Sequence, residues 1–325
     1  IVFCIAVTAA IVTMFFVPID SQYIQYFDFK ILTCIFCVLA VVNGLHHIHF
    51  FEIISKKIIR RFHTVKMAVL ALIYLTFVAS MIIANDLALI TFLPLGYYLL
   101  KNSDNLKWMA FTFIMQTIAA NLGGMLTPFG NPQNLYLYGK FQIPDLEFIS
   151  TMFLPFLYSI ILITVTCLIF VKSTPMKLTQ VNPERLNGKK TALMMGLLVI
   201  SILIVFHGIP YYVGLLVVIG VLCFADRKAL LEVDYLLLFT FCAFFVFAGN
   251  MARIPEVRDF FGYKDLLYAV NIGGIGTLIS SLASLITFRE YVKHEPKKGL
   301  RYLGLFTIIN VSFLGILIVL VMFAT

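Results

Sequence analysis

The sequence ANLGGMLTPFGNPQNLYLY occupies residues 120–138, and residues 270–288 read VNIGGIGTLISSLASLITF. The two stretches align without a gap at an offset of 150 residues. The alignment pairs Asn121 with Asn271, Gly123 and Gly124 with Gly273 and Gly274, Thr127 with Thr277, Asn131 with Ser281, and Asn134 with Ser284. The chain therefore contains an internal repeat whose copies share glycines, a threonine and small polar positions.

In the first copy, Pro128, Gly130 and Pro132 interrupt the helical pattern. Proline lacks the N–H that a helix needs, and carbonyl groups left unpaired inside a membrane need another partner. Such carbonyls, with Asn and Thr oxygens, form a hard-oxygen site suited to Na⁺. We expect the resumed helix near Asn134 to direct its positive N-terminal end at an anion. We interpret both copies as broken helices, although small residues also allow close helix packing.

The composition places the chain in a membrane. Of 325 residues, 61% are hydrophobic and 12% are charged, whereas soluble proteins carry about 25% charged residues. The apolar residues form runs at 1–18, 31–51, 67–100, 108–139, 146–171, 191–225, 235–252, 266–288 and 302–325. The net charge of +8 lies in short clusters between these runs, which argues against nucleic-acid binding. We expect a multi-pass integral membrane protein.

The basic clusters predict the topology. Most Lys and Arg residues lie in five links, at 52–66, 101–107, 172–190, 226–234 and 289–301. The positive-inside rule assigns such links to the cytoplasm. All five reach that side only if run 67–100 enters and leaves on the same side and run 191–225 turns near Pro210 into two spans. Run 67–100 then forms either a hairpin of two arms that meet at a tip or two full crossings joined by a minimal turn. The copy at 120–138 then runs outward, and the copy at 270–288 runs inward.

Two copies of opposite direction are inverted repeats, which in secondary transporters place substrate and ion sites near the membrane midplane. We therefore predict an all-α integral membrane protein, an inverted-repeat secondary transporter with a hairpin and broken helices, in the plasma (inner) membrane. The predicted parts are a first repeat at 1–171 with hairpin 67–100 and broken helix 108–139, a cytoplasmic linker at 172–190, and a second repeat at 191–325 with broken helix 266–288.

Asp86 lies in the middle of the hairpin, within the sequence MIIANDLALITFLPL. An ionised Asp at the bilayer centre costs about 2.5–3.5 kcal/mol on insertion scales, so such a residue is a candidate for function. With Asn85 it forms a polar hairpin tip. The alternative is a structural role, in which the pair caps the helix that starts at Leu87.

These stretches resemble the ion transporter superfamily, which holds arsenite permeases, citrate and dicarboxylate carriers of the divalent-anion/sodium symporter type, and some sodium/proton antiporters. The resemblance covers nearly the whole chain and is most specific at IANDLALITFLPL, NLGGMLTPFGNPQNLYL, NIGGIGTLISSLASL and residues 234–250. It implies that each half contains a re-entrant hairpin and a broken helix, whose tips and loops together hold substrate and coupling cations. Carried over, the tip is 84–86 and the loops are 127–134 and 277–284.

The chain departs from that family pattern in two places. Dicarboxylate carriers have Ser-Asn-Thr at the hairpin tip, whereas residues 84–86 are Ala-Asn-Asp, which is more similar to the arsenite-permease and antiporter-like branch. The second half also lacks room for a second hairpin, which we expect to be missing near Phe261 and Gly262. We predict that the complete gene encodes about 55–60 further residues there, as the inverted symmetry requires.

The candidate site consists of polar and glycine positions in the hairpin tip and the two broken helices. They are Asn85, Asp86, Asn121, Gly123, Gly124, Thr127, Pro128, Gly130, Asn131, Asn134, Asn271, Gly273, Gly274, Thr277, Ser280, Ser281 and Ser284. Candidates for holding Na⁺ are Asn85, Thr127, Asn131, Thr277 and Ser281. We expect no catalytic residues and no cofactor beyond Na⁺ or H⁺ as coupling ion. The expected partners are a small anionic substrate and the lipid bilayer, and a homodimer is allowed.

We expect a cation-coupled secondary transporter of a small anion, such as a carboxylate, that works by alternating access. Within transport, the alternatives are a sodium/proton antiporter and an arsenite-type permease. An intramembrane enzyme is a weaker alternative, because the apolar runs offer no Ser/His pair to perform catalysis. A channel would need a pore-lining ring or a repeated filter, which we do not find.

The stretch HHIHFFEIISKKIIRRFH starts at His46. His46, His47, His49 and Glu52 are one set of possible metal ligands. The interpretation we favour is a basic amphipathic segment at the cytoplasmic interface, where histidines and aromatic residues are common.

Overall fold

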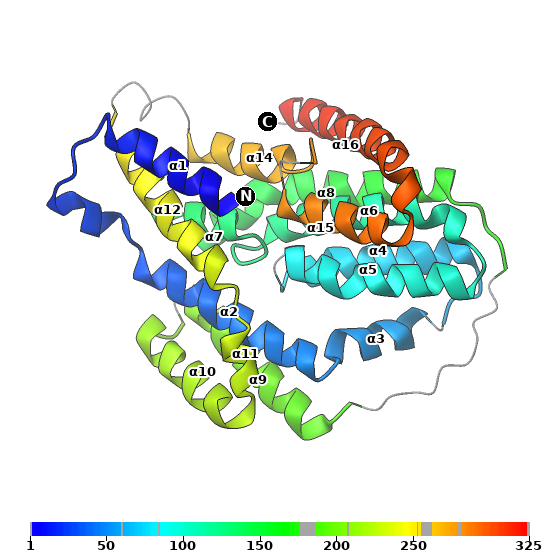
Figure 1. Cartoon of the computed structure of the whole chain (residues 1–325), viewed down its shortest axis with the longest axis horizontal. Coiled ribbons are helices and arrows are strands. Elements are labelled where there is room, and N and C mark those ends of the chain that lie inside the picture. The colour runs from blue at the N-terminus through cyan, green and yellow to red at the C-terminus, as the bar shows by residue number, and fades with distance from the viewer. Residues whose placement is uncertain are drawn as a thin grey trace. The chain divides into compact units, whose positions relative to one another are not determined.

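The computed structural model describes residues 2–59, 61–83, 85–175, 186–206, 208–251, 253–254, 262–278 and 281–323. The regular secondary structure of these residues is helical, so the predicted all-α fold is confirmed. The helices are α1 (Val2–Met14), α2 (Phe29–His47), α3 (Phe50–Ile59), α4 (Val65–Ser80), α5 (Asn85–Asn102), α6 (Met109–Gly123), α7 (Pro132–Lys140), α8 (Asp145–Phe170), α9 (Gly188–Val205), α10 (Tyr211–Ala225), α11 (Arg227–Leu231), α12 (Tyr235–Met251), α14 (Tyr263–Gly273), α15 (Leu282–His294) and α16 (Gly299–Met322) (Figure 1).

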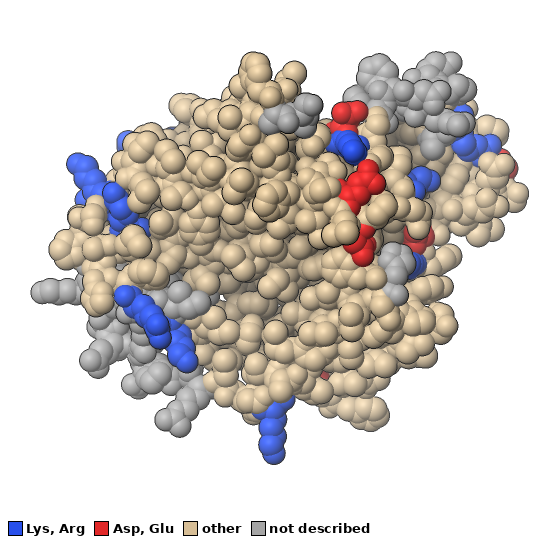
Figure 2. Space-filling view, turned by 180° about the vertical axis from the view of Figure 1, so that it is seen from behind, with Lys and Arg blue, Asp and Glu red and all other residues tan. Residues whose placement is uncertain are grey.

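Six helical segments among the described residues are long and apolar enough to cross a bilayer. They are Ser21–His47, Leu106–Leu126, Asp145–Phe170, Gly188–Val205, Arg227–Met251 and Pro296–Met322. On the face shown in Figure 2, charged side chains form small groups separated by broad areas of uncharged side chains. The chain is therefore an integral, multi-pass membrane protein.

The helix α16 shows how such a segment is patterned. Its buried residues recur every three or four positions and so form one face: Tyr302, Phe306, Asn310, Phe313, Leu317 and Val321. Between them, Ile308 is 67% exposed and Val311 is 49% exposed. An apolar outer surface of this kind is suited to contact with lipid.

The chain divides into two compact units, which we describe separately. Unit 1 contains Ile1–His47 and Ala192–Leu266, and unit 2 contains Ile48–Thr191 and Leu267–Thr325. Each unit thus combines segments from both halves of the sequence.

In unit 1, α1 packs against α12 through small residues, with Ala6, Ala10 and Ala243 buried together. The loop after α1 is joined to the end of α12 by Arg253, whose guanidinium donates to both carboxylate oxygens of Asp20 at 2.8 and 3.1 Å. This bidentate contact lowers the pKa of Asp20 below its ordinary value.

In unit 2, α4 and α5 lie side by side as the two arms of a hairpin (Figure 1). The arms contain 16 and 18 residues, which corresponds to about 24–27 Å each. The tip lies beside the break between α6 and α7, because the hydroxyl of Thr127 donates to the carbonyl of Met81 at 2.7 Å. The hairpin therefore reaches the depth of the broken helix and turns back there.

Several basic links meet at one end of unit 2. The amide of Val65, at the start of α4, donates to the carbonyl of Thr174 at 2.9 Å, and the hydroxyl of Thr174 lies 3.5 Å from Oδ1 of Asn105. Near the end of α5, the ring of Tyr97 stacks on His294 of α15 with centroids 3.6 Å apart. These contacts bring together four of the links that the positive-inside rule assigns to one side.

The place where we expect a second hairpin to be missing lies between α12 and α14. Because α12 ends at Met251 and α14 starts at Tyr263, the residues between them are too few to form two arms like α4 and α5. Residues 255–261 lie outside the described part of the chain, and the existence of further coding sequence stays a prediction.

Candidate substrate and ion site

The first broken helix consists of α6, a short 3₁₀ segment at Gly124–Leu126, an irregular loop, and α7. A Cβ atom on Gly130 would lie 2.4 Å from the carbonyl oxygen of Gly124, and one on Gly124 would lie 2.6 Å from Oδ1 of Asn131. The loop thus packs backbone against backbone where only glycine fits. Asn131 precedes Pro132 at the start of α7 and makes no side-chain capping bond there.

The second broken helix consists of α14, a turn after Gly273, and α15. Ser281 caps α15, because its hydroxyl accepts from the amide of Ala283 at 3.2 Å. Ser280 lies outside the described residues, and Gly273 and Thr277 are exposed.

A network of side-chain amides joins the two breaks. Asn131 donates to Oδ1 of Asn271 at 3.1 Å, and Asn271 donates to Oδ1 of Asn134 at 2.6 Å. Ser281 of the second copy donates to Oδ1 of Asn121 in the first copy at 2.9 Å. The contacts therefore cross between the copies in both directions.

Asn134 fastens the first loop. Its Nδ2 atom lies 3.2 Å from the carbonyl oxygen of Gly124, 3.4 Å from that of Met125 and 3.5 Å from that of Thr127. These carbonyl groups lie at and beyond the end of α6. In a continuous helix they would accept backbone hydrogen bonds, whereas here the buried amide of Asn134 donates to them.

The hairpin tip joins the same network. Asn85, the first residue of α5, donates to Oδ1 of Asn121 at 2.9 Å and accepts from the amide of Asp86 at 3.0 Å. Asp86 lies half-buried in the first turn of α5. Ala84 lies outside the described residues. Asn121 therefore connects the hairpin with the second broken helix.

Three helices begin in this network. Asn85 starts α5, Asn131 precedes α7, and Ser281 precedes α15. A helix N-terminus carries a partial positive charge and unpaired N–H groups. The side chains that join these three helix starts are neutral amides and hydroxyls. The arrangement is thus able to attract an anion without a Lys or Arg side chain.

Two polar atoms of the network, and one on Ser284 in the first turn of α15, are buried without a hydrogen-bond partner. They are Nδ2 of Asn121, Oδ1 of Asn131 and the hydroxyl of Ser284. Leaving such an atom unpaired costs about 1–3 kcal/mol. One is a donor, one is an acceptor, and the hydroxyl serves as either, so each is able to bond to a ligand that reaches it.

A cavity of about 250 Å³ lies between α5 and α15. Its lining includes Glu290 and His294 near the basic end of unit 2, and Leu89 and Ile286 further along the two helices. Leu89 is one helical turn from Asn85. The cavity therefore extends from the basic end towards the network.

The sequence analysis did not single out the buried polar residues that precede Asn121 on α6. Gln116 of α6 donates to Thr76 and to the carbonyl of Phe92, both at 3.1 Å, and Thr117 donates to Thr287 at 2.7 Å. Gln116 and Thr117 lie five and four positions before Asn121, and this spacing along one helix could have identified them as members of the same polar face. Among the described residues, no group of three His, Cys, Asp or Glu side chains is placed to hold a metal ion.

The chain is similar in sequence to one protein family and to two relatives. The sequence profile of the family described as citrate transporter matches residues 1–254. An uncharacterized transporter of Methanocaldococcus jannaschii is 30% identical over 296 residues, which cover 81% of each chain. The inner membrane protein YbiR of Escherichia coli is 23% identical over 314 residues, which cover 85% of this chain and 83% of YbiR.

Proposed function

Because this chain belongs to the citrate transporter family, we propose that it is a cation-coupled secondary transporter that moves a small anion by alternating access. Membership of the family supports transport as the activity. The nature of the substrate, the coupling ion and the mechanism are our proposals. The observation that carries them is the convergence of three helix starts on a buried network of neutral amides in unit 2.

The geometry favours an anion with several oxygen atoms. Helix N-termini supply N–H donors, and Asn121 and Ser284 add side-chain donors that lack partners. A carboxylate accepts several such bonds at once. The family name refers to citrate, and a carboxylate is therefore the first substrate class to test.

We propose Na⁺ or H⁺ as the coupling ion. Oδ1 of Asn131 is buried without a hydrogen-bond partner, in the same loop as the carbonyls of Met125 and Thr127, which Asn134 contacts at 3.4 and 3.5 Å. Na⁺ prefers oxygen ligands of this kind, and its charge would offset that of a bound anion. Asp86, in the first turn of α5, is the acidic group nearest the network along the chain.

The cavity between α5 and α15 is a candidate access path. Its lining runs from Glu290 and His294, near the end of unit 2 where the basic links meet, to Leu89, one turn from Asn85. We propose that this end faces the cytoplasm, following the positive-inside rule, and that the membrane is the plasma (inner) membrane.

A sodium/proton antiporter is the second candidate, because Asp86 offers a carboxylate that can bind Na⁺ and H⁺ in turn. Counterflow in proteoliposomes tests the first proposal and separates it from this one. A carrier of anions accumulates labelled citrate or another labelled oxyanion against an internal pool of the same compound. An antiporter shows no such counterflow but alkalinises or acidifies the lumen when a Na⁺ gradient is applied.

A further inference from the structure

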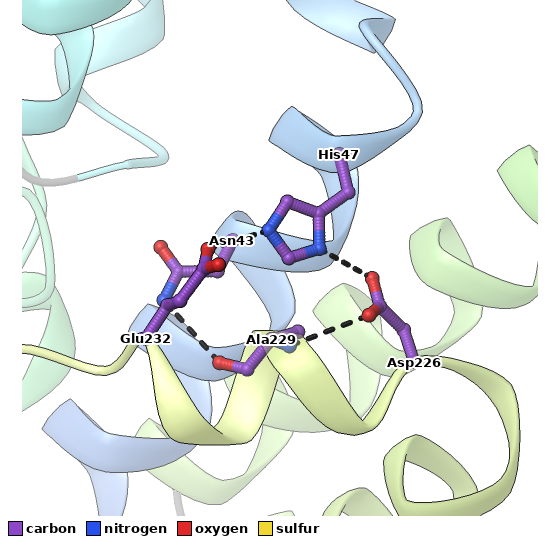
Figure 3. A network of polar contacts seen from close by, with 5 residues as sticks. All are labelled: Asn43, His47, Asp226, Ala229 and Glu232. Atoms are coloured by element: carbon purple, nitrogen blue, oxygen red, sulfur yellow. Dashed lines mark hydrogen bonds and ion pairs between the residues drawn. The ribbon is translucent and has the colours of Figure 1, made fainter.

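A histidine in unit 1 lies between two carboxylates, outside the proposed substrate site. His47 is the last residue of α2, and its Nδ1 lies 2.7 Å from Oδ2 of Asp226 while its Nε2 lies 2.6 Å from Oε2 of Glu232 (Figure 3). Asp226 and Glu232 flank the short helix α11 at its two ends. One imidazole ring therefore bridges both ends of α11.

Two further contacts complete the junction between α2 and α11. Asn43, one turn before His47, donates to the carbonyl of Ala229 at 3.3 Å, and Oδ1 of Asp226 accepts from the amide of Ala229 at 3.4 Å (Figure 3). Asp226 thus caps α11 with one oxygen and contacts His47 with the other. Movement of α11 away from α2 would break both imidazole contacts.

The chemistry of this contact depends on a proton. An ionised carboxylate only accepts hydrogen bonds, and a neutral imidazole has one donor and one acceptor nitrogen. Neutral His47 would thus place a lone pair against one carboxylate oxygen at less than 3 Å. The protonated ring donates to both carboxylates and balances their charge.

The two charged groups in contact with the ring flank α11, and among the described residues no other charged group on a helix that packs against α2 forms an ion pair with it. Helix α9 reaches α2 through Met194 beside Gly44, and its Lys189 and Lys190 are exposed in its first turn. Helices α10 and α12, which also pack on α2, contain no Asp, Glu, Lys, Arg or His, and α11 itself adds Arg227 and Lys228. Asp226 and Glu232 are the groups in hydrogen-bond contact with the imidazole. The protonation state of His47 therefore decides the strength of the junction.

The junction lies where the chain passes between the units. Unit 1 ends at His47, and unit 2 begins at the next residue, Ile48. His49 then adopts a φ of 53°, in the left-handed region that side chains other than glycine seldom occupy. A carrier that moves one unit against the other must accommodate that motion at such a connection.

We propose that His47 is a proton-binding regulatory site, which holds α11 to the end of α2 when protonated and releases one carboxylate when neutral. This inference rests on the proposed transport function. The protonated junction fixes one end of the connection between the units and slows transport. Loss of the proton loosens the junction and speeds transport. Acidification on the side of the membrane that His47 faces therefore inhibits the carrier.

Substrate exchange in proteoliposomes at equal pH on both sides tests the proposal without a proton gradient. We expect the wild-type exchange rate to rise about fivefold between about pH 5 and about pH 8, the factor that corresponds to ~1 kcal/mol. His47→Gln, which is always neutral, should exchange at the fast rate at every pH. His47→Arg, which is always charged, should stay slow.

The adjacent histidine supplies the control. His46→Gln should keep the wild-type pH profile, because His46 precedes His47 on α2 and is not the residue between the carboxylates. A His47→Gln variant with an unchanged pH profile would overturn the proposal while leaving transport intact.

Nitrogen NMR of the histidine side chains in the purified protein gives a readout that does not need transport. We expect Asp226→Asn and Glu232→Gln each to move the titration of His47 to lower pH, because each removes a negative partner. A titration that neither change affects would also overturn the proposal. If wild-type protein exchanges no substrate at any pH, the proposed function fails, and the NMR titration alone decides the role of His47.

Discussion

Asn131 donates its side-chain amide to Oδ1 of Asn271 at 3.1 Å, and the residues 150 positions away from each of them repeat this contact. These are Ser281 and Asn121, joined at 2.9 Å. Each contact joins a residue of one copy to a residue of the other, and exchanging the two copies turns one contact into the other. A two-fold axis generates reciprocal contacts of this kind. The pairing supports the interpretation of the two broken helices as two copies of one repeat.

The first prediction concerns the residues at the centre of this pairing. Asn271→Ala removes the partner of both Asn131 and Asn134, and Asn121→Ala removes the partner of both Asn85 and Ser281. Each change should destabilise the protein by about 1–3 kcal/mol, because buried polar groups lose their partners. Thermal or denaturant unfolding measures this loss, and counterflow should be abolished in both variants.

Asn310 provides the matched control for these changes. It is also fully buried, but its Nδ2 atom bonds to the carbonyl of Phe306, one turn earlier in α16. Asn310→Ala should therefore leave counterflow close to wild type. Equal loss of transport in Asn271→Ala and Asn310→Ala would mean that the network has no special role.

The second prediction concerns the glycines of the first break. Gly130→Ala places a methyl group 2.4 Å from the carbonyl oxygen of Gly124 and 2.7 Å from the hydroxyl of Thr127, so the loop must move. Overpacking of this kind costs typically ~1–3 kcal/mol. The unfolding free energy and the counterflow rate should both fall.

Gly304→Ala is the corresponding control, because nothing lies within 4 Å of the added Cβ atom. In the middle of a helix, that change should be neutral or stabilise by up to ~1 kcal/mol. Wild-type transport by Gly130→Ala would show that the loop tolerates displacement and that its backbone geometry is not needed.

Sequence reasoning identified Asn121, Asn131, Asn134, Asn271 and Ser281 as candidates because polar residues are expensive inside apolar runs and because the same positions recur in both copies. The structure brings all five into one network. It also explains the glycines, which allow Gly124 and Gly130 to approach each other. The polar positions and the glycines are local or repeated features, so they can be recognised from the sequence alone.

Contacts between distant segments were not predictable in this way. Thr117 bonds to Thr287 because α6 and α15 pack together, and neither residue belongs to a motif. His47 was interpreted as part of a basic amphipathic segment, and its carboxylate partners lie about 180 residues further along the chain. Such pairs depend on how helices cross, which side-chain periodicity does not specify.

The third prediction tests Na⁺ as the coupling ion. If Na⁺ binds beside Oδ1 of Asn131, it should stabilise the protein relative to K⁺ or choline at equal ionic strength, by about 2.7 kcal/mol at 100 times its dissociation constant. Thermal unfolding in the three salts measures the difference, and Asn131→Ala should abolish it. Identical melting of the wild type in all three salts would leave protons as the driving ion.

The last prediction is that Asp86 controls coupling. It lies in the first turn of α5, next to Asn85, whose side chain joins the network through Asn121. Asp86→Asn keeps the shape of the side chain and its ability to cap the helix but removes the negative charge, so it separates the structural role from the coupling role.

We expect Asp86→Asn to fold and insert normally and to retain substrate exchange, because exchange needs no net movement of the coupling ion. Accumulation driven by a Na⁺ or proton gradient should be lost. Asp104→Asn, in an exposed loop after α5, is the control and should accumulate substrate normally. If Asp86→Asn accumulates substrate at the wild-type rate with unchanged dependence on pH and Na⁺, Asp86 acts only as a helix cap, and another group must carry the coupling ion.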